Sequence, residues 1–159
     1  MITILKNLFS LVLPITVLVL VPMWVENEIS LKNPISLLAG SLIMAPGLIV
    51  FFSSVFLFIR KGKGTLAPWN PPVKLVVSGF YRYVRNPMIM AVLIILTGEA
   101  IIFLSIEIFL WAILFFFINS LYFSLSEEPG LEKRFGEAYL DYKKNVRMWI
   151  PKLKPYQPL

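Results

Sequence analysis

Four long apolar runs, separated by short polar segments, dominate the pattern of this chain. They cover about residues 8–25, 34–59, 87–106 and 108–126. A helix needs ~20 apolar residues to cross the ~30 Å hydrocarbon layer of a bilayer, and the runs are close to or above that length. Glu99 is the one charged residue within them. The pattern predicts an all-α fold, a polytopic membrane helix bundle with about four spanning helices.

Prolines and glycines inside the first two runs predict where the helices bend and pack. A bend is expected at Pro14 or Pro22 and at the Pro46-Gly47 pair. Gly40 and Gly47 lie two helical turns apart on one side, where a neighbouring helix can approach closely. No small-residue cleavage site follows the first run, so we interpret it as a retained helix and not as a signal peptide.

The links after the third and fourth runs carry two further structural signals. Residues 105–107 alone are available for a turn between these runs, which predicts a tight antiparallel hairpin. Beyond the fourth run, apolar residues recur at spacings of three and four from Leu131 to Val146. This spacing predicts a C-terminal amphipathic helix. Trp149 follows it as an expected anchor at the membrane interface.

The composition supports a membrane protein and excludes several kinds of active site. Apolar residues make up 58% of the 159 residues, too many for the surface of a soluble domain to cover. Cysteine and histidine are both absent. The usual ligands of zinc and haem iron are therefore missing, and Ser-His or Cys-His nucleophilic catalysis is excluded. We expect no metal and a single domain, residues 1–159.

The uneven placement of charge predicts the topology. The net charge is +6, and the 60–86 segment carries six Lys or Arg residues and no acidic residue. The positive-inside rule places this segment in the cytoplasm. Four spans then put the N- and C-termini there as well, where basic residues face anionic lipid headgroups. Nucleic acid is not expected as a partner.

Two cytoplasmic segments hold most of the chemically useful side chains. Arg82 and Arg85 precede the third run, and Glu127 and Glu128 follow the fourth. A hairpin of the last two helices would bring these four side chains together. Two glutamates at a helix C-terminus oppose the helix dipole unless a cation compensates them, either an arginine or a positively charged ligand. The alternative is a set of surface ion pairs without a function.

Glu99 needs an explanation of its own, because a charged glutamate inside a bilayer costs roughly 2–4 kcal/mol. One interpretation is a site residue that faces the bundle interior. The other is a packing residue, protonated or hydrogen-bonded to Asn119. Asn119 and Tyr122 are three residues apart and share a helix face, which is expected to point toward Glu99.

Five ordered motifs resemble those of a known family of membrane enzymes. They are residues 66–72 (LAPWNPP), 79–88 (GFYRYVRNPM), 127–131 (EEPGL), 135–142 (FGEAYLDY) and 149–151 (WIP). This order resembles the isoprenylcysteine carboxyl methyltransferase family and the related phospholipid methyltransferases. The resemblance covers about residues 60–155. Arg85-Asn86-Pro87 stands where the carboxyl methyltransferases often have Arg-His-Pro.

The resemblance implies a methyltransferase with S-adenosyl-L-methionine as cofactor, held by the cytoplasmic segments 60–86 and 127–155. Arg82 or Arg85 is expected to bind the cofactor carboxylate, and Glu127 and Glu128 its ammonium or ribose diol. The other expected cofactor-binding residues are Asn86 and Pro87 of the arginine motif and three aromatic residues for the adenine: Tyr81, Tyr83 and Trp149. The expected catalytic residues are Glu127, Arg85 and Glu99, with Glu99 or one of the paired glutamates as a base.

The methyl acceptor is expected to be a lipophilic or small molecule that offers a carboxylate, an amine or a thiol, with membrane lipids as neighbours. Two alternatives stay open: a small membrane transport or structural protein, and a lipid-binding family member without catalysis. A transporter should place its polar groups near the bilayer midplane. Only Glu99 and Asn119 are expected there, and this favours a cofactor pocket.

Overall fold

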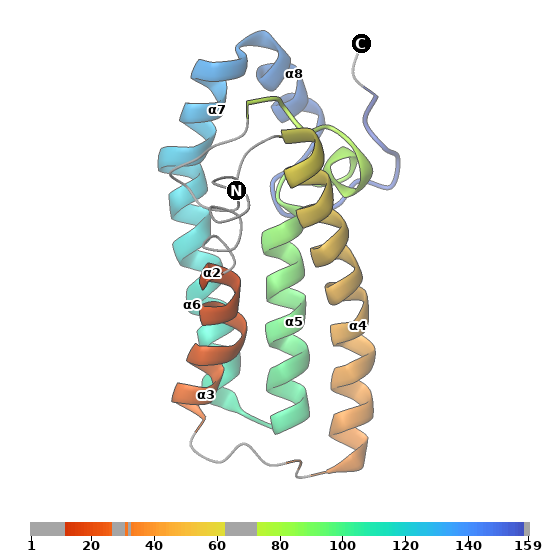
Figure 1. Ribbon diagram of the computed structural model, residues 1–159, viewed down its shortest axis with the longest axis vertical. Helices are drawn as coiled ribbons and strands as arrows, with labels where there is room; N and C mark the ends of the chain where they lie inside the picture. Colours follow the sequence, from red (N-terminus) through yellow and green to blue (C-terminus); the bar gives the residue numbers. More distant parts are fainter. Residues whose placement is uncertain (1–11, 27–30, 32, 63–72, 158–159) are drawn as a thin grey trace, which may run out of the picture.

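The computed structural model describes residues 12–26, 31, 33–62 and 73–157, and its regular elements are helices (Figure 1). No β-strand occurs among these residues, so the prediction of an all-α fold is confirmed for them. The predictions for residues 8–11 and for the 66–72 motif lie outside the described residues.

The first apolar run forms a helical rod of three segments: α2 (Val12–Ile15), the π-helix η1 (Thr16–Leu20) and α3 (Val21–Val25). The π segment accompanies Pro22, one of the two prolines at which a bend is predicted. Proline has no N–H to donate back along the helix.

A side chain from the fourth apolar run satisfies a backbone carbonyl that the π-helix η1 leaves free. The N–H of Val21 bonds to the carbonyl of Thr16, five residues back, and Pro22 offers no donor. The carbonyl of Val17 is therefore left without a helical partner, and Trp111 Nε1 donates to it at 3.1 Å. This bond ties the first rod to the fourth apolar run.

The second rod consists of α4 (Pro34–Leu57) and the π-helix η2 (Phe58–Gly62). Asn33 caps its start, because its side-chain oxygen accepts a hydrogen bond from the N–H of Ile35 at 2.8 Å. Pro34 takes the first helical position, where a missing N–H costs nothing.

Helix α4 packs closely against α5 (Pro87–Phe103). A Cβ atom placed on Gly40 would lie 2.5 Å from the carbonyl oxygen of Gly98, and one placed on Gly47 would lie 3.0 Å from the side chain of Ile95. At Gly40 only a hydrogen atom fits. The prediction that a neighbouring helix approaches Gly40 and Gly47 is confirmed.

Helices α5 and α6 (Ile106–Tyr122) run in opposite directions and are joined by Leu104 and Ser105 (Figure 1). Leu104 ends α5 in the left-handed conformation, with φ 51°. The side chain of Ser105 caps α6 and accepts from the N–H of Ile108 at 3.2 Å. The link therefore lies earlier than predicted, and Glu107 belongs to the first turn of α6.

Helix α6 does not stop where the fourth apolar run stops. The chain continues through the π-helix η4 (Phe123–Glu127) into α7 (Glu128–Phe135). Pro129 lacks an N–H, and the N–H of Glu128 bonds to the carbonyl of Phe123, so the helix widens instead of ending. The prediction that Glu127 and Glu128 lie at a helix C-terminus is therefore wrong, and the dipole argument does not apply to them.

The C-terminal amphipathic segment is two helices, because α8 (Glu137–Asn145) follows a turn at Gly136. Gly136 has φ 52° and ψ −132°, a conformation that a residue with a Cβ atom rarely adopts. The prediction of a single helix is wrong here, since apolar spacing does not register this turn. Helix α8 still buries one side, with Tyr139 and Tyr142 only 2% and 3% exposed.

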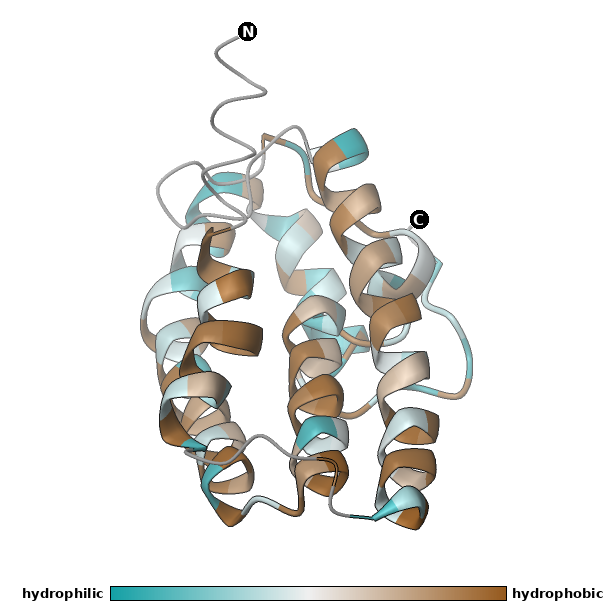
Figure 2. Ribbon diagram, turned by 60° about the horizontal axis from the view of Figure 1, so that its bottom comes forward, coloured by the Kyte–Doolittle hydropathy of each residue, from teal (hydrophilic) through white to brown (hydrophobic). Residues whose placement is uncertain are grey.

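Two helical rods, Pro34–Gly62 and Ile106–Phe135, are long and apolar enough to cross a membrane. The helices Val12–Val25 and Pro87–Phe103 are apolar but shorter. Large hydrophobic side chains are exposed along α4 and α6, and brown, the colour of hydrophobic residues, recurs along the helices in Figure 2. Helices that are apolar on all sides suit a lipid environment.

Candidate functional site

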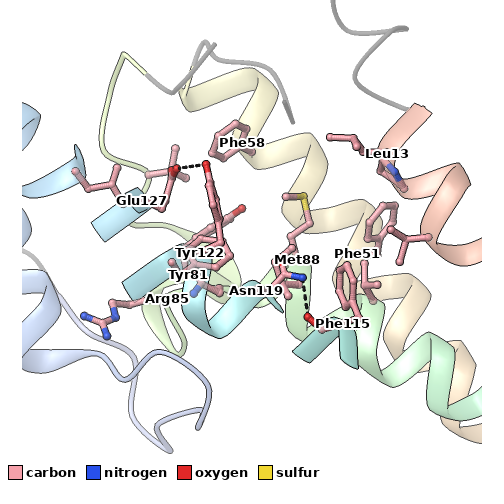
Figure 3. A pocket seen from close by; sticks show the side chains of 18 of the residues that line it. Leu13, Phe51, Phe58, Tyr81, Arg85, Met88, Phe115, Asn119, Tyr122 and Glu127 are labelled. Atoms are coloured by element: carbon pink, nitrogen blue, oxygen red, sulfur yellow. Dashed lines mark hydrogen bonds between the residues drawn. The ribbon is translucent and has the colours of Figure 1, made fainter. Parts of the chain in front are cut away.

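A pocket of about 340 Å³ lies where α5, α6, η4, α8 and the 3-10 helix η3 (Gly79–Arg82) meet. This volume falls in the ~300–1,000 Å³ range of small-molecule sites. One side of the pocket is apolar, and its residues come from several helices: Leu13, Val17, Phe51, Val92 and Phe115. Figure 3 shows Leu13, Phe51 and Phe115 on one side of the pocket and Glu127 on the other.

Four of the predicted site residues line the polar side of the pocket: Tyr81, Arg85, Asn86 and Glu127. Asn119 and Tyr122 of α6 join them. Two stretches of chain that are distant in the sequence therefore meet around one cavity. This is the arrangement expected for the arginine motif and the glutamate pair, although only some members of each face the cavity.

Arg85 is held at the pocket wall by an ion pair and has donors to spare. Its Nη2 atom lies 2.9 Å from Glu128 Oε1, and the two side chains are 10% and 7% exposed. Within the described residues, Arg85 Nε and Nη1 and Asn86 Nδ2 are buried without a hydrogen-bond partner. Glu128 Oε1 likewise has no aligned hydrogen bond, so its contact with Arg85 is an ion pair. Unsatisfied buried donors are costly, and an anionic group that reached them would satisfy them.

Glu128 lies behind Arg85 and does not line the pocket. Its Oε2 atom lies 3.0 Å from Lys143 Nζ, and this amine also contacts Glu132 Oε1 at 2.6 Å. Hydrogen bonds to Glu132 and Glu128 raise the pKa of Lys143, so the amine stays charged. Lys143 therefore bridges Glu128 and Glu132. Two glutamates one helical turn apart are the signal that points to a shared cation.

Glu127 presents a carboxylate to the pocket. The hydroxyl of Tyr122 donates to its Oε2 atom at 3.2 Å (Figure 3). A carboxylate has more acceptor sites than one hydrogen bond uses, so Glu127 can also accept from an ammonium or hydroxyl group. The pocket thus offers donors on one wall and an acceptor on another.

Arg82 and Tyr83 hold the C-terminal tail and do not line the pocket. Arg82 Nε donates to the carbonyl of Tyr156 at 2.6 Å. The backbone N–H groups of Tyr156 and Lys152 donate to the carbonyls of Arg82 and Tyr83, both at 2.9 Å. These bonds fix the segment before α5 against the tail.

Helix α8 places Tyr81 and contributes to the pocket wall. The hydroxyl of Tyr142 donates to the carbonyl of Tyr81 at 2.6 Å. Burial raises the pKa of Tyr81, Tyr139 and Tyr142, so the three phenols stay neutral and Tyr142 keeps the proton it donates. All three line the pocket. The amphipathic pattern identifies Tyr139 and Tyr142 as buried but not as site residues.

Trp149 and Pro87 lie near the site without lining the pocket. The indole of Trp149 packs against Phe116 and Phe123, with ring centroids 5.4 and 6.1 Å apart. Pro87 is fully buried at the first position of α5. Trp149 therefore packs against Phe123, which lines the pocket.

Glu99 lies away from this pocket. Roughly three helical turns, on the order of 18 Å, separate it from Pro87 at the start of α5. Its Oε2 atom is buried and has no hydrogen-bond partner among the described residues. Asn119, the partner expected for it, donates instead to the carbonyl of Phe115 at 2.8 Å and lines the pocket. The expected pairing of Glu99 with Asn119 is therefore wrong.

Comparison with known protein families gives a match. A family model described as phospholipid methyltransferase matches residues 35–138, about two thirds of the chain. The matched range contains all of α4 but its first residue, all of α5 and α6, and both segments that build the polar side of the pocket. No curated protein and no solved structure matches the chain.

Proposed function

Because the chain belongs to the phospholipid methyltransferase family, we propose that it is an integral membrane enzyme that transfers a methyl group from S-adenosyl-L-methionine to a lipophilic or small acceptor. The family supports a methyltransferase and a lipid-related substrate.

The polar side of the pocket supports a site for S-adenosylmethionine. This molecule has a carboxylate and an ammonium group, and the residues present complement both. Arg85 and Asn86 have buried donors without partners for the carboxylate, and Glu127 is an acceptor for the ammonium. Tyr81 adds an aromatic face. When bound, S-adenosylmethionine supplies an electrophilic methyl group on its sulfonium.

The main support for the proposal is a single pocket that has both a polar and an apolar side. Methyl transfer needs the reacting atoms aligned at about 3–3.5 Å, and such a pocket can hold a polar cofactor against an apolar acceptor. Leu13, Phe51 and Phe115 suit the hydrocarbon part of an acceptor. An amine or thiol acceptor must also lose a proton, and Glu127 is the carboxylate in the pocket that can take it.

The remaining predicted residues are proposed to act on the shape of the site. Glu128 holds Arg85 in place. Four others fix the walls through the tail contacts and the packing described above: Arg82, Tyr83, Pro87 and Trp149. Glu99 lies too far from Arg85 and Glu127 to contact their ligands, and we assign it no role in the pocket.

The distribution of charge supports a multi-pass topology. We place four rods across the bilayer, with α5 and α6 as a hairpin and with residues 1–159 as one domain. The basic segment 60–86, the segment 127–155 and both termini then lie on the cytoplasmic side. In this orientation the polar side of the pocket lies at the inner interface, within reach of a water-soluble cofactor.

Calorimetric titration of S-adenosylmethionine into the detergent-solubilised protein tests the cofactor site. The wild type should give binding heat, and Arg85→Ala and Glu127→Gln should each abolish it. Arg60→Ala and Glu137→Gln are matched controls, because they change exposed charges outside this pocket. No heat from the wild type, or undiminished heat from both pocket variants, would contradict the site.

Transfer of label from methyl-labelled S-adenosylmethionine then tests the reaction. Labelled lipid supports a lipophilic acceptor, and a labelled water-soluble product supports a small one. Binding heat without any labelled product would indicate a lipid-binding family member without catalysis. Neither heat nor product would favour a transport or structural protein.

A further inference from the structure

Lys143 links the C-terminal helix α8 to the Arg85 side of the pocket. Its Nζ atom lies 3.0 Å from Glu128 Oε2 and 2.6 Å from Glu132 Oε1. The second oxygen of Glu128, Oε1, lies 2.9 Å from Arg85 Nη2. A row of alternating charges therefore runs from Glu132 through Lys143 and Glu128 to Arg85 at the pocket wall.

The use of the two Glu128 oxygens determines which donors of Arg85 stay free. Carboxylates and guanidinium groups tend to form bidentate pairs with two parallel hydrogen bonds. Here Lys143 engages Oε2, and Glu128 contacts Arg85 through Oε1. Arg85 Nε and Nη1 are left without a hydrogen-bond partner among the described residues.

Lys143 is held next to Glu128 by the helix that carries it and by a second acidic residue. Helix α8 is anchored by Tyr139 and Tyr142, which are almost completely buried, and Glu132 binds the same amine. Its raised pKa keeps it charged. Without Lys143, the buried carboxylate of Glu128 would lose one cation, and the free donors of Arg85 would be its nearest substitute.

We infer that Lys143 is a positioning residue of the cofactor site: it holds Glu128 in a one-oxygen contact and so keeps Nε and Nη1 of Arg85 available to the carboxylate of S-adenosylmethionine. The identity of this ligand rests on the proposed function. Lys143 does not line the pocket, so its effect passes through Glu128.

Cofactor binding and steady-state kinetics of three variants test this role. Lys143→Met should weaken S-adenosylmethionine binding about tenfold, the equivalent of one lost charge-assisted hydrogen bond. The KM for the cofactor should rise by a similar factor, while kcat at saturating cofactor stays within about twofold. Lys143→Arg keeps the charge and should restore both, and Lys144→Met, on the exposed side of α8, should change neither.

The ligand-free protein gives an independent readout. In a nitrogen-15 arginine-labelled sample, the Nε–H resonance of Arg85 can be identified by its loss in Arg85→Lys. Lys143→Met should shift this resonance and slow its exchange with water, because Glu128 is then free to bind Arg85 with both oxygens. Glu132→Gln loosens Lys143 without removing it and should give a smaller shift in the same direction.

The outcomes separate the two proposals. An unmoved Arg85 resonance in Lys143→Met overturns the inference, as does a moved resonance with unchanged cofactor affinity. A loss of kcat at unchanged KM also overturns it. If the wild type binds no S-adenosylmethionine, the proposed function fails, and so does the ligand assigned to Arg85. The Nε–H resonance of Arg85 still decides in that case whether Lys143 positions this side chain.

Discussion

Removing one partner of the Arg85–Glu128 ion pair should cost far more stability than removing a surface charge. The charges lie 2.9 Å apart on side chains that are 10% and 7% exposed, so water screens them little. At an effective dielectric constant of about 20, two unit charges at this distance attract each other by about 6 kcal/mol. Much of this attraction offsets the cost of desolvating both groups. Glu128→Gln leaves Arg85 buried without its counter-ion and should lower the free energy of unfolding by about 3–5 kcal/mol.

A double-mutant cycle separates the ion pair from its two side chains. Arg85→Met leaves Glu128 with Lys143 at 3.0 Å, so the expected loss is smaller, about 1–3 kcal/mol. In the double variant Arg85→Met with Glu128→Gln, the buried pair is gone and neither of its charges is left uncompensated. Its loss should fall short of the sum of the single losses by about 1–3 kcal/mol. The exposed control Arg60→Ala should change stability by less than about 0.5 kcal/mol.

Unfolding by sodium dodecyl sulfate in mixed micelles, followed by far-ultraviolet circular dichroism, measures these free energies if the transition is two-state. Strictly additive losses for Arg85 and Glu128 would refute the reasoning, because the two side chains would then not interact in the folded protein. A loss for Glu128→Gln no larger than that for Arg60→Ala would refute it as well.

Three further predictions concern close packing and the buried tyrosines. Gly40→Ala should destabilise the protein by about 1–3 kcal/mol, because the new Cβ would lie 2.5 Å from a backbone carbonyl oxygen of α5. The control is Gly130→Ala, whose Cβ would first meet a side-chain atom at 3.6 Å. This variant should instead stabilise α7 by about 0.5–1 kcal/mol. Equal changes in thermal stability for Gly40→Ala and Gly130→Ala would contradict the packing of α4 on α5. Tyr142→Phe should lose about 1–3 kcal/mol in the same assay, because the buried carbonyl of Tyr81 loses its donor at 2.6 Å, and an unchanged stability would show that this bond contributes nothing. Burial raises the pKa of Tyr81, Tyr139 and Tyr142. Above pH ~10 the unfolded chain therefore binds fewer protons than the folded protein. The free energy of unfolding should then fall by up to about 1.4 kcal/mol per pH unit for each tyrosine. Tyrosinate absorbance equivalent to all six tyrosines that develops near pH 10 in the folded protein would contradict the burial of these phenols.

The helical class and the close approach of two helices could be predicted from the sequence alone. Apolar runs of membrane length exclude strands and loops as their main structure, because a backbone in lipid must satisfy its own hydrogen bonds. The spacing of Gly40 and Gly47 places both on one side of a helix, and α5 packs there. These features depend on local composition and on helical period, which the sequence displays directly.

Helix boundaries depended on hydrogen bonds that composition does not display. Pro129 is typical of a helix end, yet the chain widens into a π-helix and continues. Gly136 interrupts an apolar spacing that would otherwise fit one long helix. In both places the local sequence is compatible with either a continuous helix or a helix end, and the packing of α7 and α8 selects between the two.

Tertiary structure alone decided which side chains form the pocket. The sequence determines that Arg82, Arg85, Glu127 and Glu128 are available near one end of the bundle, but it does not orient them. Consecutive helical residues point about 100° apart, so Glu127 faces the cavity while Glu128 faces Arg85 and Lys143. The surroundings of each side chain come from segments far away in the chain, and these segments meet only when the helices pack.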